Sequence, residues 1–168
     1  VEIDKAVITV SDNVDKSKID TLRTISTGNI IVESITEDKA DLATINAFEA
    51  TITAGDVILS NAVINVTDDV NKSEADTINA YNNVSGTVNL SSITDSFSNI
   101  SSVQSTSGIT LSTATITSTD GVSLANANTL NGFTNKKVTL NSVEDTYDNI
   151  QLIKAIDTAK VDMEAAAI

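Results

Sequence analysis

The sequence repeats itself, and this property limits the fold more than any other. Residues 1–8, 57–64, 109–116 and 161–168 share one apolar pattern, with an alanine at the sixth position of each segment. The four starts are separated by 56, 52 and 52 residues, which gives repeats 1–56, 57–108 and 109–160 and a partial repeat 161–168. Repeats of this length stack on their neighbours, so we expect residues 1–168 to form a single array.

Each long repeat contains a second start that resembles the first, at Ile30, Val88 and Val138. Successive starts are 21 to 31 residues apart, which is too short for independently folding domains. Alternating apolar and polar residues at each start predict a short strand. Apolar residues at every third position downstream predict a short α- or 3₁₀-helix. These positions are Ile19, Leu22, Ile25; Leu42, Ile45, Phe48; Ala75, Ile78, Tyr81; Phe97, Ile100, Val103; Ala127, Leu130, Phe133; and Tyr147, Ile150, Ile153.

The order strand, turn, short helix and return predicts an α/β repeat protein. Repeated in one direction, it gives a parallel β-solenoid with short helical returns and right-handed crossovers. An all-β parallel β-helix is the alternative. On the helical interpretation, the aromatic residues of the apolar period are candidates for the core; they are Phe48, Tyr81, Phe97, Phe133 and Tyr147.

An acidic residue recurs where each strand gives way to a helix. The residues are Asp12, Glu37, Asp68, Asp95, Asp120 and Asp145. We favour helix capping, by the acid or by the preceding Ser11, Thr67 or Thr119, because a carboxylate or hydroxyl oxygen accepts hydrogen bonds from the first helical amides. Calcium is the alternative, with Asp68, Asp69 and Asp120 as the candidate metal ligands. The glycine-rich calcium nonapeptide and the EF-hand loop are both missing, so this would be a weak surface site.

Composition excludes several functions. The chain has no His and no Cys, which removes His- or Cys-based nucleophilic sites, zinc sites of these ligands and disulfides. A formal net charge of −13 argues against nucleic acid and anionic membranes as partners, and no apolar run predicts insertion into a membrane. We therefore expect no enzyme and no catalytic residues. A carboxylate-based hydrolase and an ice-binding face on the Thr-rich segment 109–119 are remote alternatives.

The recurring segments 66–78 and 145–150 resemble the repetitive regions of large bacterial cell-surface proteins, namely surface-layer proteins and type I-secreted adhesins. The strand followed by a helical return also resembles a leucine-rich repeat. The resemblance implies export, an extracellular location at the bacterial cell surface, and often calcium dependence. It predicts a structural or self-assembling segment whose partners are other copies or neighbouring domains of one parent protein. The alternative is an adhesin-type module that binds a glycan or host-surface ligand. The first residue is Val1, which suggests a segment of a longer protein.

Overall fold

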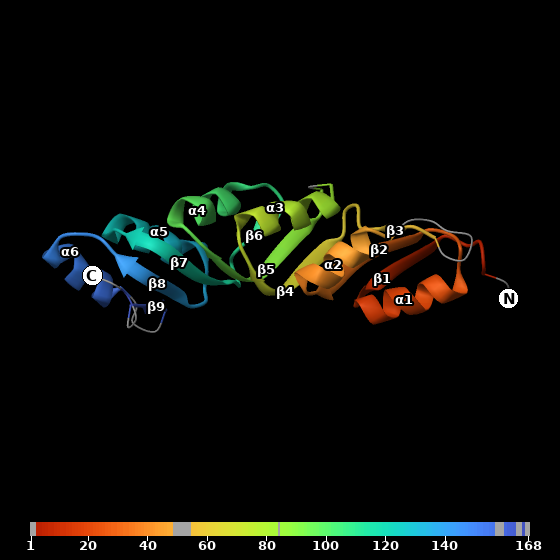
Figure 1. Ribbon diagram of the computed structural model, residues 1–168, viewed down its shortest axis with the longest axis horizontal. Helices are drawn as coiled ribbons and strands as arrows, with labels where there is room; N and C mark the ends of the chain where they lie inside the picture. Colours follow the sequence, from red (N-terminus) through yellow and green to blue (C-terminus); the bar gives the residue numbers. More distant parts are fainter. Residues whose placement is uncertain (1–2, 49–54, 84, 157–159, 164–165, 167–168) are drawn as a thin grey trace. The chain divides into compact units, whose positions relative to one another are not determined.

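The computed structural model describes residues 3–48, 55–83, 85–156, 160–163 and 166. Helices alternate with the longer strands along this part of the chain (Figure 1). The strands are β1 (Ile8–Val14), β2 (Ile30–Glu37), β3 (Val57–Ile58), β4 (Val63–Val70), β5 (Thr87–Asp95), β6 (Ile109–Thr110), β7 (Thr115–Val122), β8 (Val138–Val143) and β9 (Val161–Asp162). The helices are α1 (Lys16–Ile25), α2 (Lys39–Asn46), α3 (Lys72–Tyr81), α4 (Phe97–Ser105), α5 (Leu124–Phe133) and α6 (Tyr147–Ala155).

The strands form one all-parallel sheet of nine strands in the order β1-β2-β4-β5-β7-β8-β9, with β3 beside β2 and β6 beside β5. Parallel neighbours need a crossover connection, and here each crossover contains a helix. The predicted parallel α/β class is therefore confirmed. The all-β alternative is wrong, because the six helices contain 8 to 10 residues each.

We call a strand and the helix that follows it a module. Each long repeat has an opening module (β1–α1, β4–α3, β7–α5) and a closing module (β2–α2, β5–α4, β8–α6). Contacts divide the chain into two compact parts, residues 1–67 with 77–88 and residues 68–76 with 89–168.

The apolar positions of the strands form rows across the sheet. In the first part Ile35 pairs with Ile64, and in the second Ile93 pairs with Ile116; all four are fully buried. The opposite face is polar, so one face of the sheet is packed and the other is turned towards solvent. Each added strand thus lengthens an apolar row that a single module could not bury.

The helices bury many of the residues that the spacing of three predicted, but not all, since Ile25 is 45% exposed. Examples are Leu42 and Ile45 of α2 and Ile100 and Val103 of α4, which have no exposed surface. The prediction that the aromatic residues lie in the core is wrong, because none of the five is buried and Tyr147 is 75% exposed. Helices of this length leave only a narrow buried stripe, which Ile, Leu, Val and Ala fill. No helix of the described residues is long and apolar enough to cross a membrane.

In the second and third long repeats, a turn at the recurring alanine separates a short strand (β3 or β6) from the longer strand that follows it (β4 or β7). The amide of Ala62 donates to the carbonyl of Leu59 over 2.8 Å, and the amide of Ala114 donates to Leu111 over 2.9 Å. A buried polar side chain at the end of the same module's helix then binds the alanine carbonyl. Ser26 Oγ donates to Ala6 over 2.8 Å, Asn82 Nδ2 to Ala62 over 3.3 Å, and Thr134 Oγ1 to Ala114 over 2.6 Å. We call this bond the alanine latch; it closes each opening module on itself.

Candidate functional site

The six recurring acidic residues occupy two kinds of position. In closing modules the acid stands two residues before the helix, as Asp95 does before Phe97. In opening modules it stands four residues before the helix, as Asp120 does before Leu124, and it belongs to the strand. A β-bulge lies at this acid, because β7 uses one residue more than β8 between the paired positions Ser118 and Gly121. β1 has the same irregularity next to Asp12.

The helix N-caps are not the residues that the sequence predicted. Ser11, Thr67 and Thr119 lie inside strands that continue for three residues beyond them. The capping side chains stand directly before each helix and accept the amide three residues further on. They are Asp15, Asp38, Asn71, Ser96, Ser123 and Thr146. The prediction for the hydroxyl residues was wrong because the strand of an opening module continues beyond the acid, so the helix begins four residues after the acid instead of two.

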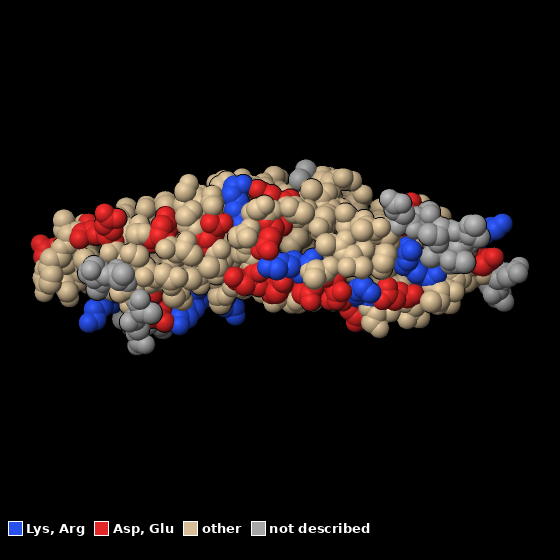
Figure 2. Space-filling model, in the orientation of Figure 1, with Lys and Arg blue, Asp and Glu red and all other residues tan. Residues whose placement is uncertain are grey.

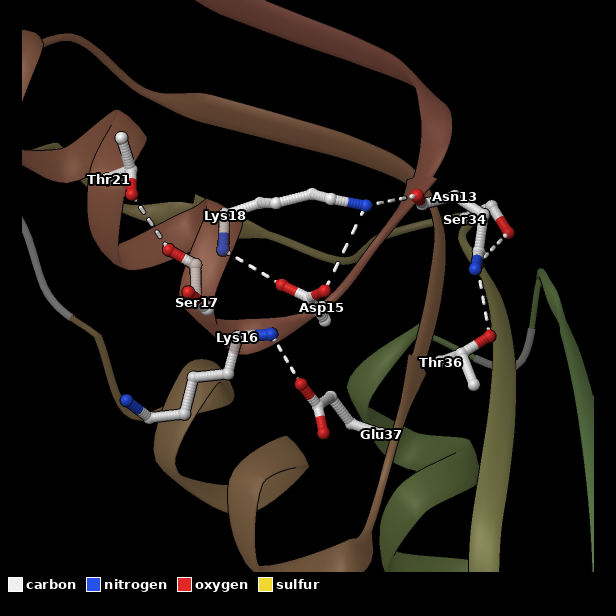
Figure 3. Close-up of polar contacts among 9 residues, drawn as sticks. All are labelled: Asn13, Asp15, Lys16, Ser17, Lys18, Thr21, Ser34, Thr36 and Glu37. Carbon is white, nitrogen blue, oxygen red and sulfur yellow. Dashed lines mark hydrogen bonds and ion pairs between the residues drawn. The ribbon is translucent and has the colours of Figure 1, made fainter.

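Four of the recurring acids instead cap the helix of the preceding module. Each carboxylate accepts the amide of the first residue of that helix. The pairs are Lys16 with Glu37, Lys72 with Asp95 (2.9 Å), Phe97 with Asp120 (2.8 Å) and Leu124 with Asp145 (2.9 Å). We call these four bonds the inter-module caps; Figure 3 shows the first of them. The expectation that recurring acids accept helix-start amides is confirmed for these residues, but the helix belongs to the neighbouring module.

Each of two closing-module acids accepts hydrogen bonds from the starts of two helices. Asp95 Oδ2 caps α3, and its Oδ1 accepts the Ser96 amide and Asn99 Nδ2 at the start of α4, both over 2.8 Å. Partial burial raises the pKa of Asp95, but the bonds from Lys72, Asn99 and Ser96 outweigh it and leave the pKa lowered.

Asp145 repeats this arrangement between α5 and α6. Its Oδ1 accepts the Thr146 amide and Asn149 Nδ2, again over 2.8 Å. The pKa of Asp145 is lowered by the Leu124 amide first, and then by Asn149 and Thr146. Both carboxylates are therefore held in the charged form that the four helix starts require.

An open groove of about 600 Å³ lies beside the first inter-module cap, along α1 and α2. Four carboxylates line it, namely Asp15, Asp20, Glu37 and Asp41. Asp15 caps α1, Glu37 binds the Lys16 amide, and Asp20 binds Lys16 Nζ over 2.6 Å. The bond to Asp20 raises the pKa of Lys16 in spite of desolvation. Three of the four carboxylates in the groove thus take part in helix-start or side-chain bonds.

The polar face of the sheet carries ladders of hydroxyl and amide side chains. Ser34 and Thr36 donate to Asn13 Oδ1 over 2.9 and 3.1 Å (Figure 3), and Asn65 Nδ2 donates to Thr36 Oγ1 over 3.2 Å. In the second compact part, three threonines form a row across neighbouring strands, because Thr94 pairs with Thr117 and Thr117 with Thr139. This face offers regularly spaced polar groups.

The candidate calcium ligands do not form a three-carboxylate group in the structure. Asp69 lies on β4 and accepts from Ser92 Oγ over 2.6 Å, whereas Asp120 lies on β7 and accepts from Ser118 Oγ over 2.8 Å. Strand β5 stands between β4 and β7. No group of three or more acidic residues suited to a metal occurs among the described residues. Acidic side chains are nevertheless prominent on the face drawn in Figure 2, and the site at Asp68, Asp69 and Asp120 stays a prediction.

Comparisons with protein families, with curated proteins and with solved structures find no match for this chain. The sequence pattern and the geometry of the modules therefore carry the functional argument.

Proposed function

We propose that this chain is a structural, non-enzymatic segment of a secreted bacterial surface protein and that it takes part in self-assembly. In this proposal its modules form a right-handed solenoid, similar to a leucine-rich repeat, at the outside of the cell. Its partners are further copies or neighbouring domains of the same parent protein.

The observation that carries the proposal is the set of inter-module caps. Each cap joins a carboxylate of one module to the first helical amide of the module before it, as between Asp145 and Leu124. A helix start has four amides without a partner inside the helix, so each of these four capped modules depends on the next for one of them. An arrangement of this kind favours continuation of the array, and a scaffold needs this property more than an enzyme does.

The second candidate is an adhesin-type module that binds a glycan or a host surface. The row formed by Thr94, Thr117 and Thr139 on the polar face of the sheet supports it. Hydroxyl groups at the spacing of parallel strands, about 4.8 Å, are suited to a flat ligand with repeated polar groups.

Electron microscopy of the purified chain separates the two functions. Samples are compared with calcium, with magnesium as the matched divalent control, and with a chelator. Ordered sheets or filaments in at least one condition are expected for a self-assembling segment. A chain that remains monomeric in all three conditions and binds a glycan array would contradict self-assembly and favour the adhesin. The magnesium sample shows whether an effect of calcium is specific.

A further inference from the structure

The charged side chains of the second compact part gather at two opposite edges of the sheet. All strands are parallel, so they end at one edge, where the helices begin; we call it the carboxyl edge. The helices end at the opposite edge, where the strands begin, and we call it the amino edge. Among the described residues of this part, Lys72 is the one basic residue at the carboxyl edge, and every other charged residue there is an acid, such as Asp95, Asp120 or Asp148.

The amino edge of the same part carries the opposite charge. Its charged residues precede β8, occupy the last turn of α6 or stand at β9. The described ones are four lysines and one acid, namely Lys136, Lys137, Lys154, Lys160 and Asp162. At the left of Figure 2, where Figure 1 places β8 and α6, red atoms lie towards the upper border and blue atoms along the lower border.

Helix capping explains only part of the charge at the carboxyl edge. The carboxylates of Asp95, Asp120 and Asp145 bind amides at helix starts. Glu144 and Asp148 are exposed at the same edge, and no described residue donates to their carboxylates. These two acids leave negative charge for a partner outside the chain.

The amino edge also keeps charge that the chain does not neutralise. Lys137 pairs with Asp162 over 2.5 Å. Lys136, two residues before β8, and Lys154, in the last turn of α6, are both exposed. No described residue accepts from the ammonium group of either lysine. The module β8–α6 therefore presents positive charge at one end and negative charge at the other.

We infer that copies of this chain pack side by side, with the amino edge of one copy against the carboxyl edge of the next. A chain with a net charge of −13 repels its copies in most orientations, whereas this orientation brings opposite charges together. The chain itself supplies both edges, so a second copy is the partner with complementary charge. The contact joins two different surfaces and does not close on itself, so it extends into an open row.

The first compact part lacks this separation of charge. Lys5 stands beside Asp4 ahead of β1, and Lys18 pairs with Asp15 over 3.9 Å at the start of α1. Acids and bases thus share both ends of the module β1–α1. The side-by-side contact is therefore assigned to the second part, and lysines of the first part provide control substitutions.

Salt dependence is the first test of the contact. Sedimentation velocity of the purified chain, with a chelator present, measures the association constant at ionic strengths of about 0.01 and about 0.1 M. The screening length falls from about 30 to about 10 Å over this range. We expect a loss of at least about tenfold in the association constant at the higher ionic strength. Equal constants at both ionic strengths would contradict a contact between charged edges.

Exchange of charge between the two edges is the second test. Lys136→Glu with Lys154→Glu makes both edges of the module acidic, and Glu144→Lys with Asp148→Lys makes both basic. Each double variant alone is expected to associate at least about tenfold more weakly than the unchanged chain. An equimolar mixture of the two regains association, because the altered edge of one faces the altered edge of the other.

The matched control changes the net charge equally in the first part. Lys5→Glu with Lys18→Glu replaces two exposed lysines there and is expected to associate as the unchanged chain does. Equal melting temperatures show that all variants fold, since exposed charges contribute little to stability. A loss of association in this control equal to that of Lys136→Glu with Lys154→Glu would mean that net charge alone sets the association, which overturns the contact.

The inference rests on the proposed self-assembly, and the two fail in different ways. Association that is unchanged in both charge-reversed variants overturns the side-by-side contact and leaves self-assembly standing. Association that occurs only with calcium has the same consequence, because the cation then bridges two acidic edges. An unchanged chain that never associates overturns both.

Discussion

The opening and closing modules both cap the start of the preceding helix, but the backbone around the capping acid differs between them. In both, an acid near the end of the strand caps the preceding helix, as Asp120 does for α4 and Asp145 for α5. The closing strand β5 runs without interruption, whereas its opening neighbour is broken into β6 and β7 by the alanine turn and carries the bulge next to Asp120. The same cap is therefore reached from two local structures.

The distance between the acid and its own helix explains why one carboxylate of a closing module binds the starts of two helices. A closing-module acid stands directly before its own N-cap residue, as Asp95 does before Ser96, so its second oxygen reaches the start of its own helix. In an opening module the acid stands four residues before the helix, as Asp120 does before Leu124, and the alanine latch closes the module instead. In these closing modules the acid thus accepts the hydrogen bonds from both helices. In an opening module the acid caps the preceding helix, and the alanine latch makes the bond within the module.

The largest expected effect comes from crowding the alanine turn of an opening module. A Cβ on Gly86 would lie 2.0 Å from the carbonyl oxygen of Ala62 and 2.8 Å from Asn82 Nδ2. Gly86→Ala therefore destabilises the fold by about 3 kcal/mol, measured by urea denaturation. Gly132→Ala is the control, because no atom lies within 4 Å of its Cβ and alanine favours the helix by about 1 kcal/mol. Equal stability of both variants would show that the return after the helix does not pack on the turn.

The next effect tests the alanine latch itself. Thr134→Val keeps the shape of the side chain but removes the hydroxyl that donates to Ala114 and accepts the Lys136 amide. A buried carbonyl and an amide lose their partner, so we expect a loss of about 2 kcal/mol in the free energy of unfolding. Thr139→Val, on the polar face of β8, is the matched control and stays close to the original stability. A neutral Thr134→Val would mean that water replaces the latch.

Much of the fold follows from the sequence because its signals are local. Apolar residues such as Leu42 and Ile45 recur at the spacing of a helix face, and alternation at Val88 and Leu90 indicates a strand; the structure buries all four. The parallel order of the strands follows from repetition of one unit in one direction. These features need no knowledge of distant contacts.

The caps could not be assigned from local pattern alone. Asp120 looks like an N-cap for the helix that follows it, but the bulge separates the two and its partner is Phe97, 23 residues earlier. The bonded residues Lys72 and Asp95 are also 23 positions apart in the sequence, whereas Leu124 and Asp145 are 21 positions apart. These separations of 21 and 23 residues were present in the sequence. They indicate a cap only once the strands are known to lie side by side.

The two kinds of acid can be compared directly by removing one of each. Asp95→Ala removes the partner of two backbone amides and one side-chain amide, whereas Asp120→Ala removes the partner of one amide and one hydroxyl. We expect losses of about 1.5 and 0.7 kcal/mol in the free energy of unfolding, since these sites are open to water. Urea denaturation of both variants shows which one loses more free energy of unfolding. A larger loss for Asp120→Ala than for Asp95→Ala would contradict the prediction.

The smallest effect is the pH dependence of the closing-module acids. The pKa of Asp95 is lowered by folding, so its contribution to stability is complete above the unfolded value of about 3.9 and is lost as the pH falls through the folded value. The stability difference between the unchanged chain and Asp95→Asn should therefore be constant at neutral pH and narrow below about pH 4. Asn99→Ala removes one of the donors that lower this pKa, so in that variant the loss begins at higher pH. Thermal unfolding across this pH range measures the stability of all three chains. A stability difference between the unchanged chain and Asp95→Asn that widens in acid would mean that the Asp95 carboxylate is not charged in the folded state.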